Sequence, residues 1–300
     1  MLELNRIYNM DCMEGMRAIP NDSIDLIVTD PPYRTTSRGS AGNSGGMLQK
    51  KINKEGRVFK FNDISVSDYI PECYRVLKEK GHFYIMTNHV NLISMLNTCT
   101  ENGFHFIKSL VWDKGNKIMG TAYMSQFEYI LFFRKGGFKR INECGTADIL
   151  SVPNKKTKGA DGKNIHDTEK PVELMEVLIR NSSKDGDVVL DPFMGSGTTA
   201  VACINTNRNY IGFEIDPDYY EAAQERIRIH MQQQTIFELL KGGLAMPKGY
   251  EKMRNSIRKR MLQKGLTPAK ADKEAKRIAA ATWNKNHPKN PVTSKPHKKK

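Results

Sequence analysis

Short apolar runs alternate with segments of helical periodicity over most of the chain. Runs typical of strands cover residues 23–30, 82–88, 104–112, 128–135, 187–193 and 210–216. Apolar residues spaced three and four apart predict helices at 65–81 and 172–180, and two further helices are expected to begin near residues 198 and 218. Strands that alternate with helices are typical of α/β proteins, so the pattern predicts an α/β fold with a sheet rich in parallel strands.

The helix predicted at 65–81 has a well-defined apolar face, which comprises Ile70, Cys73, Tyr74 and Leu77. Gly81 follows this face and is a typical helix stop. Two polar, glycine-rich segments interrupt the pattern, at residues 34–58 and 136–165. Loops of this length in a compact domain are usually functional or mobile. We expect the first to be a mobile loop and the second to be an inserted loop region.

The excess positive charge lies at the carboxyl end. The sequence has 47 Lys and Arg against 33 Asp and Glu, a formal net charge of +14. Residues 241–300 contain 18 of the basic and 3 of the acidic residues, which gives this segment +15 and residues 1–240 a net charge of −1. The division predicts one large domain over 1–240 and a basic tail over 241–300. Such a block of charge indicates an arm that binds a polyanion, nucleic acid first, and a solvated terminus is the alternative.

Within the tail, apolar spacing predicts two helices, at 250–265 and 267–286. Thr267 is suited to cap the second helix, with Pro268 at its first position. Residues 287–300 have too little apolar content to fold, so we expect a disordered end.

Composition argues against several classes of protein. No run of about 18 apolar residues predicts a membrane span, and the N-terminus lacks the pattern of a signal peptide. The five cysteines are scattered and never spaced as C-x-x-C, which argues against a disulfide framework or a zinc site and favours the reducing cytoplasm.

A glycine turn follows the apolar strand that ends in "VVLDPF". Asp191 closes the strand, and Gly195 and Gly197 precede a helix that begins near Thr198. Glycines let a ligand approach the backbone, and a helix N-terminus offers N–H groups to an anionic group. About twenty residues later Glu214 ends the next strand, where a carboxylate can accept hydrogen bonds from ribose.

The turn is not a complete dinucleotide fingerprint, because alanine occupies its third glycine position. It is not a nucleotide-triphosphate loop either, because no Gly-Lys-Ser/Thr follows, and this argues against an NTPase. An adenosyl ligand with an amino-acid group fits the turn. The alternative is a tight strand-to-helix turn without a ligand.

A second strand ends abruptly in "LIVTDPPY". Asp30, Pro31, Pro32 and Tyr33 follow four apolar or β-branched residues. Taken alone, this tetrapeptide predicts an ordinary strand-terminating turn with a half-buried ring.

Several motifs in order carry a family resemblance. "DPPY", "DPFMGSGTT" and "GFEID" resemble the amino-methyltransferases that modify exocyclic amines of DNA bases with S-adenosylmethionine. "IYNMDC", "LVWDKGNK" and "HDTEKP" resemble further segments of the same enzymes, and "DPPY" ahead of the glycine turn is similar to the permuted motif order of their β group. The resemblance covers about residues 4–230. It implies a Rossmann-like class I methyltransferase fold, with a mixed, mostly parallel sheet and helices on both faces.

The resemblance also implies a set of site residues and no metal. The catalytic residues implied are Asp30, Pro31, Pro32 and Tyr33. The cofactor-binding residues implied for S-adenosylmethionine are Asp11, Cys12, His166, Lys170, Asp191, Phe193, Gly195, Gly197, Thr198 and Glu214. Three of these have simpler alternatives: Asp11 as a helix cap, His166 as a loop residue, and Lys170 as a stem that covers apolar surface.

In the family's chemistry, the Asp30 carboxylate and the Pro31 carbonyl accept the two N–H groups of a base amine, and Tyr33 stacks on the extruded base. Aspartate at the first position favours N6 of adenine in duplex DNA, with N4 of cytosine as the alternative. A non-catalytic DNA-binding protein is the rival from another class. The family usually carries its target-recognition segment at the position of 136–165. This segment is short here, so either it recognises the target minimally or the basic tail shares the role. We also expect 34–58 to close over the base. A homodimer and a cognate restriction endonuclease are further candidate partners.

Overall fold

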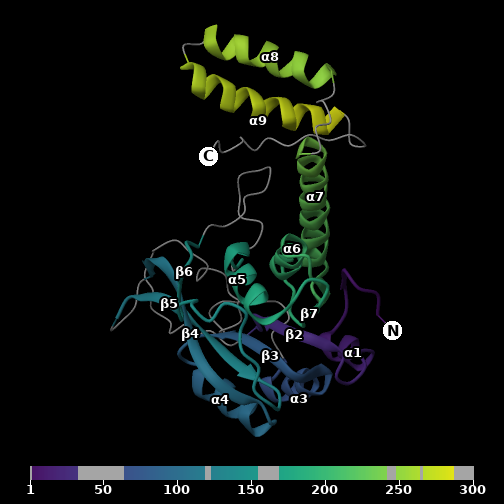
Figure 1. The fold of residues 1–300 in the computed structure, drawn as a ribbon, viewed down its shortest axis with the longest axis vertical. Coiled ribbons are helices and arrows are strands. Elements are labelled where there is room, and N and C mark those ends of the chain that lie inside the picture. Colours follow the sequence, from purple (N-terminus) through teal and green to yellow (C-terminus); the bar gives the residue numbers. More distant parts are fainter. Residues whose placement is uncertain are drawn as a thin grey trace, which may run out of the picture. The chain divides into compact units, whose positions relative to one another are not determined.

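A computed structural model describes residues 2–32, 64–118, 123–154, 169–241, 248–263 and 266–286. The chain divides into two compact units, Met1–Arg226 and Ile227–Lys300, which we describe separately (Figure 1). The predicted mobile loop 34–58, together with Tyr33, His166 and the last fourteen residues, lies outside the described residues.

The first unit contains a sheet of eight strands among the described residues. These are β1 (Arg6–Tyr8), β2 (Ile24–Thr29), β3 (Leu77–Thr87), β4 (His105–Ile118), β5 (Ser125–Arg134), β6 (Ile149–Ser151), β7 (Val188–Asp191) and β8 (Asn209–Phe213). Their order is β1-β8-β7-β2-β3-β5-β4-β6. Neighbours pair in parallel except β3 with β5 and β5 with β4, so the predicted mixed, mostly parallel sheet is confirmed.

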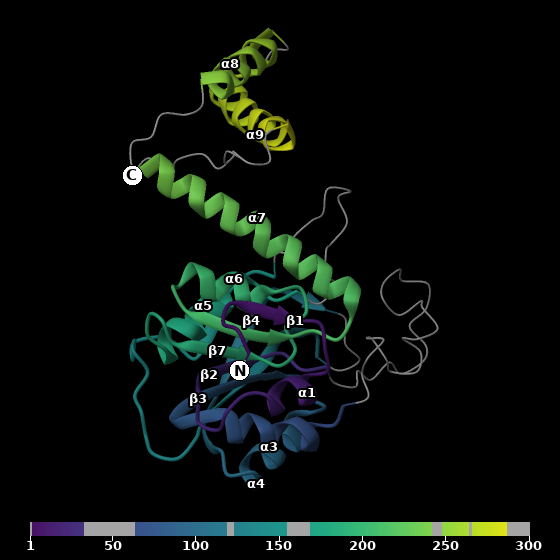
Figure 2. The ribbon, with the colours of Figure 1, turned by 90° about the vertical axis from the view of Figure 1, so that its right-hand side faces the viewer.

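Helices cover both faces of this sheet (Figure 2). One face carries α1 (Cys12–Arg17), α3 (Val66–Val76) and α4 (Leu92–Glu101), and the other carries α5 (Val172–Ser182) and α6 (Thr198–Asn205). The main core lies between the first three helices and the sheet, where residues such as Met16, Ile70, Met95 and Phe83 are completely buried. The fold is therefore the Rossmann-like arrangement that the sequence predicts.

The helix predicted at 65–81 is wrong after Val76. α3 ends at Val76, and Leu77 is extended, with φ −71° and ψ 133°. Leu77 pairs in parallel with Ile24 of β2 and is completely buried, so the apolar residue that continued the helical stripe begins a strand instead. Gly81 is not a helix stop, because it lies within β3 against the Leu77 side chain. Burial in the sheet outweighs the local helical pattern here.

The sheet order brings the candidate motifs to one edge. β2, β7 and β8 are adjacent and parallel, so their carboxyl ends, which lead into Asp30, Asp191 and Glu214, lie together. β5 runs antiparallel to β3, so its first residues, including Glu128, reach the same edge. The end of β4 lies beside the start of β5 and brings Lys114 there as well. Ligands of open α/β sheets bind at this carboxyl edge.

The first part of the 136–165 segment lies at the opposite edge. Asn142 donates to the carbonyls of Arg180 and Ser183 at the end of α5, and the Lys139 carbonyl lies 3.1 Å from Nε2 of His82 near the start of β3. The chain then returns along β6, parallel to β4, towards the edge that holds Asp30. Residues 155–165 lie outside the described part of the chain.

The second unit contains the predicted helix pair. α7 (Pro217–Lys241) runs across the unit boundary, and α8 (Lys248–Gln263) and α9 (Pro268–Asn286) follow. α8 and α9 pack on each other through a small core of Tyr250, Ile257, Ala275 and Ala279, in agreement with the prediction of two helices. Within the described parts of the chain, every helix falls short of the length or apolar character that crossing a bilayer requires.

Candidate active site

Asp30 stands directly after β2 with its carboxylate buried. Oδ2 accepts a hydrogen bond from Nζ of Lys170, which is 7% exposed. Oδ1 is also buried, and among the described residues it has no hydrogen-bond partner. Burial raises the pKa of Asp30, and the positive charge of Lys170 opposes this rise. A buried carboxylate oxygen without a donor is costly, so Oδ1 is an acceptor that an incoming N–H group would satisfy.

Four charged side chains form a buried network around this carboxylate. Lys170 Nζ lies 3.5 Å from Glu128 Oε2, and Lys114 Nζ lies 2.5 Å from Glu128 Oε1. The two ammonium groups lie 6.0 and 5.2 Å from the centre of the Trp112 ring. The network contains two carboxylates and two ammonium groups, so the charges balance inside a site that excludes much of the water.

Lys170 lies beside Asp30, and its ammonium group binds the Asp30 carboxylate. The predicted role of Lys170 in cofactor binding stays a prediction. Sequence reasoning assigned no role to Glu128 or Lys114. Glu128 is a single charged residue at the start of an apolar strand, and Lys114 lies within the "LVWDKGNK" segment of the resemblance.

The glycine turn adopts the backbone that its sequence predicts. Gly195 and Gly197 have φ values of 53° and 78°, in the left-handed region that favours glycine. Gly197 is the N-cap of α6 and provides no side-chain cap for the helix N–H groups. A Cβ at this position would lie 3.1 Å from Cβ of Ala223, so a side chain here would also crowd α7.

Glu214 joins the end of β8 to this turn. Oε2 accepts from the Gly195 N–H at 2.8 Å, and Oε1 accepts from the Asp216 N–H at 2.8 Å. Burial raises the pKa of Glu214, and the two backbone donors oppose the rise. Each oxygen retains a second lone pair, so the carboxylate remains able to accept from hydroxyl groups of a ligand.

Asp191, at the end of β7, connects the end of β2 to the start of α6. It is 2% exposed, and its oxygens accept from Thr29 Oγ1 at 2.7 Å and Thr199 Oγ1 at 2.6 Å. Burial raises its pKa to about 6. Since Thr29 immediately precedes Asp30, this pair of hydrogen bonds ties the catalytic strand to the first turn of α6. In this structure Asp191 supports the turn and does not face an open surface.

Arg226 connects the turn to the segment before α5. Its guanidinium donates to the carbonyl and hydroxyl oxygens of Ser196 and to Thr198 Oγ1, and it lies 2.6 Å from Glu169 Oε1. Glu169 is 4% exposed and precedes Lys170. Adjacent residues of the "HDTEKP" segment thus contact Asp30 directly and the glycine turn through Arg226. No local pattern marks Arg226 as a site residue, because it lies in an ordinary helical segment.

The remaining predicted residues lie near the start of α1 and after β7. Asp11 caps α1, since its Oδ1 accepts from the N–H groups of Met13 and Glu14, as the alternative interpretation expects. Cys12 is buried, and burial raises the pKa of its thiol to about 12. The Phe193 ring packs edge-on against Tyr69 with 4.9 Å between the ring centres. Pro31 is buried next to Asp30 and Pro32 is partly buried.

These groups fit an adenosyl ligand that carries an amino-acid group. The α6 N-terminus has orphan N–H groups with no side-chain cap at Gly197, and Glu214 supplies acceptors beside it. Gly195, Gly197, Thr198 and Glu214 are the residues that would hold such a ligand.

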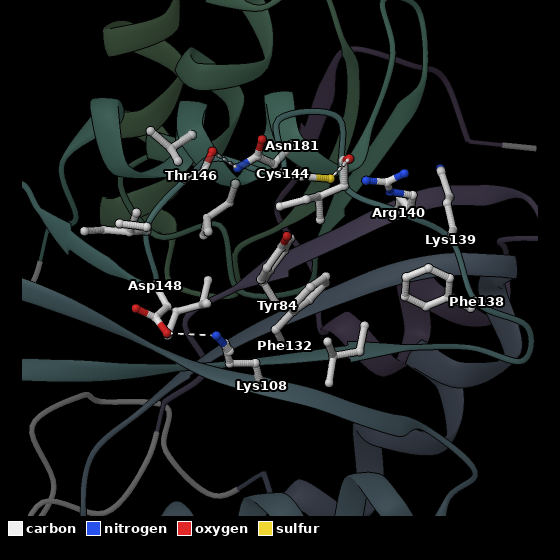
Figure 3. A pocket seen from close by; sticks show the side chains of 17 residues that line it. Tyr84, Lys108, Phe132, Phe138, Lys139, Arg140, Cys144, Thr146, Asp148 and Asn181 are labelled. Atoms are coloured by element: carbon white, nitrogen blue, oxygen red, sulfur yellow. Dashed lines mark hydrogen bonds and ion pairs between the residues drawn. The ribbon is translucent and has the colours of Figure 1, made fainter.

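A separate cavity of about 460 Å³ lies between the sheet and residues 138–148 (Figure 3). Tyr84 and Phe132 form stacked rings in its wall. Polar side chains at the cavity pair with each other, Lys108 with Asp148 at 2.9 Å and Asn181 with Thr146 at 3.1 Å. The lining contains none of the residues of the carboxylate network or the glycine turn, and we assign no ligand to it.

A mostly parallel α/β sheet with a glycine turn after one strand and an acid after the next is the arrangement of Rossmann-like proteins that bind adenosyl ligands. The sequence profile described as "DNA methylase" matches residues 24–225. The Type II methyltransferase M.HinfI of Haemophilus influenzae is 31% identical over 98% of this chain and 87% of its own length. The chain therefore belongs to the family of S-adenosylmethionine-dependent DNA amino-methyltransferases.

Solved structures agree on the fold. The M1.HpyAVI–SAM complex has a TM-score of 0.55 at 26% identity and covers 74% of this chain and 98% of its own. The PvuII DNA methyltransferase, which is cytosine-N4-specific, has a TM-score of 0.58 at 20% identity and covers 74% of this chain and 85% of its own. The second likeness shows the fold alone. The protein is a DNA methyltransferase of the N6-adenine/N4-cytosine family, and its cofactor is S-adenosylmethionine.

Proposed function

We propose that this enzyme methylates N6 of adenine in duplex DNA. The observation that carries the proposal is the buried Oδ1 of Asp30, an acceptor without a hydrogen-bond partner among the described residues. Aspartate at the first position of "DPPY" supports adenine over cytosine, because adenine-modifying relatives more often carry it. N4 of cytosine is the second candidate, since both amines offer similar chemistry.

An aromatic amine is a poor nucleophile because its lone pair is delocalised into the ring. Acceptors on both N–H groups favour a pyramidal nitrogen, and the Asp30 carboxylate and the Pro31 carbonyl are the acceptors in this proposal. Proline fixes the backbone and has no N–H to join a strand ladder. The base must leave the duplex to reach them, which costs a few kcal/mol.

When bound, S-adenosylmethionine supplies an activated methyl group on a positively charged sulfur. The amine nitrogen would accept this methyl group, with the sulfur as leaving group, and would then lose one proton. In this proposal Asp30 would receive the proton on Oδ1, which has no hydrogen-bond partner among the described residues. Most of the rate enhancement then comes from positioning the two reactants.

The test is transfer of a tritiated methyl group to DNA, followed by nucleoside analysis. Label on N6 of adenine is expected, and label only on cytosine would select the second candidate. Asp30→Ala should abolish transfer and leave cofactor binding nearly unchanged by calorimetry, because Gly195 and Glu214 are retained. Retained transfer in this variant would refute the mechanism.

For the basic tail, we propose contact with DNA phosphates. The support is the charge of +15 over residues 241–300 and the presence of a helix pair with its own small core. The target-recognition role of 136–165, the closing role of 34–58, a homodimer and a cognate restriction endonuclease stay predictions. Sequencing of methylated bases in DNA from expressing cells would give the base and the recognition site together.

A further inference from the structure

The position of Lys170 raises a problem for the proposed acceptor. Its ammonium group binds Asp30 Oδ2 in a site where both side chains are largely buried, with 8% and 22% exposed. A carboxylate that is neutralised by a lysine attracts the hydrogen of an amine less strongly. It also becomes a weaker base for the proton that the methylated nitrogen must lose.

The network contains a second position for the same ammonium group. Glu128 Oε2 lies 3.5 Å from Lys170 Nζ, is buried, and has no hydrogen-bond partner among the described residues. Lys114 holds the other oxygen of Glu128 at 2.5 Å and so fixes the carboxylate in place. A small movement of Lys170 would therefore exchange a hydrogen bond to Asp30 for one to Glu128.

Trp112 provides a surface along which this movement is favourable. Its ring is 1% exposed and is held by a 2.8 Å hydrogen bond from Nε1 to the Val152 carbonyl. Lys170 Nζ lies 6.0 Å from the ring centre, within the range of a cation–π interaction. The ammonium group is therefore never without a partner between its two positions.

We propose that Lys170 is a mobile counter-ion that binds Asp30 in the free enzyme and moves to Glu128 when the target amine enters. The proposal rests on the proposed role of Asp30 as acceptor. The amine then meets a carboxylate with both oxygens available, and the methylated nitrogen transfers its proton to a carboxylate that no lysine neutralises. Glu128 and Lys114 are positioning residues, since they act on the reaction through Lys170.

Glu128→Gln tests the proposal, because glutamine keeps the size of the side chain but removes the charge that receives Lys170. We expect the single-turnover rate of methyl transfer at neutral pH to fall by about tenfold to a hundredfold, with unchanged cofactor affinity. Glu128→Asp retains the charge and should recover part of the rate. Glu176→Gln on α5 is the matched control: Glu176 is similarly exposed, accepts from Asn205 Nδ2 at 2.6 Å, and should leave the rate unchanged.

The pH profile of the same rate separates an electrostatic effect on Asp30 from a purely structural effect of the substitution. The charged or titratable groups around Asp30 are Lys170, Glu128, Lys114, Asp191 and Tyr69. In Glu128→Gln, Lys170 stays on Asp30 and favours the ionised form, so the acidic limb should move to lower pH. In Lys170→Met the cation is lost, so the limb should move to higher pH and the rate should recover as the pH rises.

Shifts in the same direction, or none, overturn the proposal, because both charges act on Asp30. Opposite shifts also follow from the two charges at fixed positions, so movement of Lys170 is tested by its position in the complex with DNA. A crystal structure with DNA and an unreactive cofactor analogue gives a direct view: Lys170 against Glu128 is expected, and Lys170 still bound to Asp30 beside the base overturns the proposal. Asp30→Ala distinguishes a failure of the counter-ion proposal from a failure of the proposed acceptor role of Asp30. If Asp30→Ala is inactive and Glu128→Gln behaves as wild type, the counter-ion proposal alone fails; if Asp30→Ala is active, the acceptor role fails first.

Discussion

The buried Asp191 carboxylate gives a quantitative prediction about how the two halves of the site are held together. Its pKa is raised to about 6, from the ordinary value of 3.8, because it is buried. A difference of about 2 pKa units corresponds to about 3 kcal/mol. Since the folded-state pKa is the higher one, protonated Asp191 stabilises the folded state. This contribution to the free energy of unfolding is complete below about pH 4 and is lost as the pH rises through about 6.

Asp191→Asn cannot ionise and should therefore lack this pH dependence. Through this group the wild type should lose about 1.4 kcal/mol of its free energy of unfolding between pH 5 and pH 8. The variant lacks this loss, so its free energy of unfolding should rise by that amount relative to the wild type over the interval. Thr29 and Thr199 both donate to the wild-type carboxylate. An amide can accept from one hydroxyl and donate to the other, so the loss of stability at pH 5 should be about 1 kcal/mol or less.

Urea unfolding at the two pH values measures the effect. The sequence has two tryptophans, so Trp283→Phe as a common background leaves Trp112 as the fluorescent reporter within the first unit. Asp185→Asn is the control, because the Asp185 side chain is 71% exposed, and it should keep the wild-type pH dependence. An equal change in the free energy of unfolding for wild type and Asp191→Asn would refute the reasoning.

Three further predictions concern the cofactor turn and the tail. Arg226→Gln removes the ion pair with Glu169 and the contacts to the turn, so calorimetry should show cofactor affinity lower by about tenfold; unchanged affinity would show that the turn needs no such support. Gly197→Ala combines a φ of 78° with a close contact to Ala223 and should lower stability by about 1–3 kcal/mol in thermal unfolding, and a neutral result would contradict the need for glycine. Deletion from residue 245 should weaken DNA binding and flatten its dependence on salt, whereas an unchanged slope would favour a role in binding protein.

The six longer strands and most helices could be predicted from the sequence, because apolar runs and helical spacing are local properties. The three-residue strands β1 and β6 are too short to show such a pattern. Leu77 shows where this fails. Its spacing continues the α3 stripe, but pairing with Ile24 of β2 places it in a strand. That pairing joins residues more than fifty positions apart, so no local pattern reports it.

In the candidate site, too, some residues could be found from the local sequence and others depend on strand pairing. Asp30 and Glu214 follow apolar strands, and the glycines stand between a strand and a helix, so each could be found from its neighbours in sequence. Glu128 and Lys114 lie in a β-hairpin whose role depends on which strand lies next to it. The sequence cannot show that β5 pairs with β3, and that pairing is what brings Glu128 to Lys170.

The join between β2 and β7 has a consequence for how such enzymes can be encoded. The strands are direct neighbours, held by a parallel ladder and by the hydrogen bond from Thr29 to Asp191, while no short connecting loop is involved. The positions of the reactive groups therefore depend on lateral pairing in the sheet and not on which half of the polypeptide is synthesised first. A gene for this architecture can carry the halves in either order, or on two chains that associate through these strands, and still place a base acceptor beside the same cofactor turn.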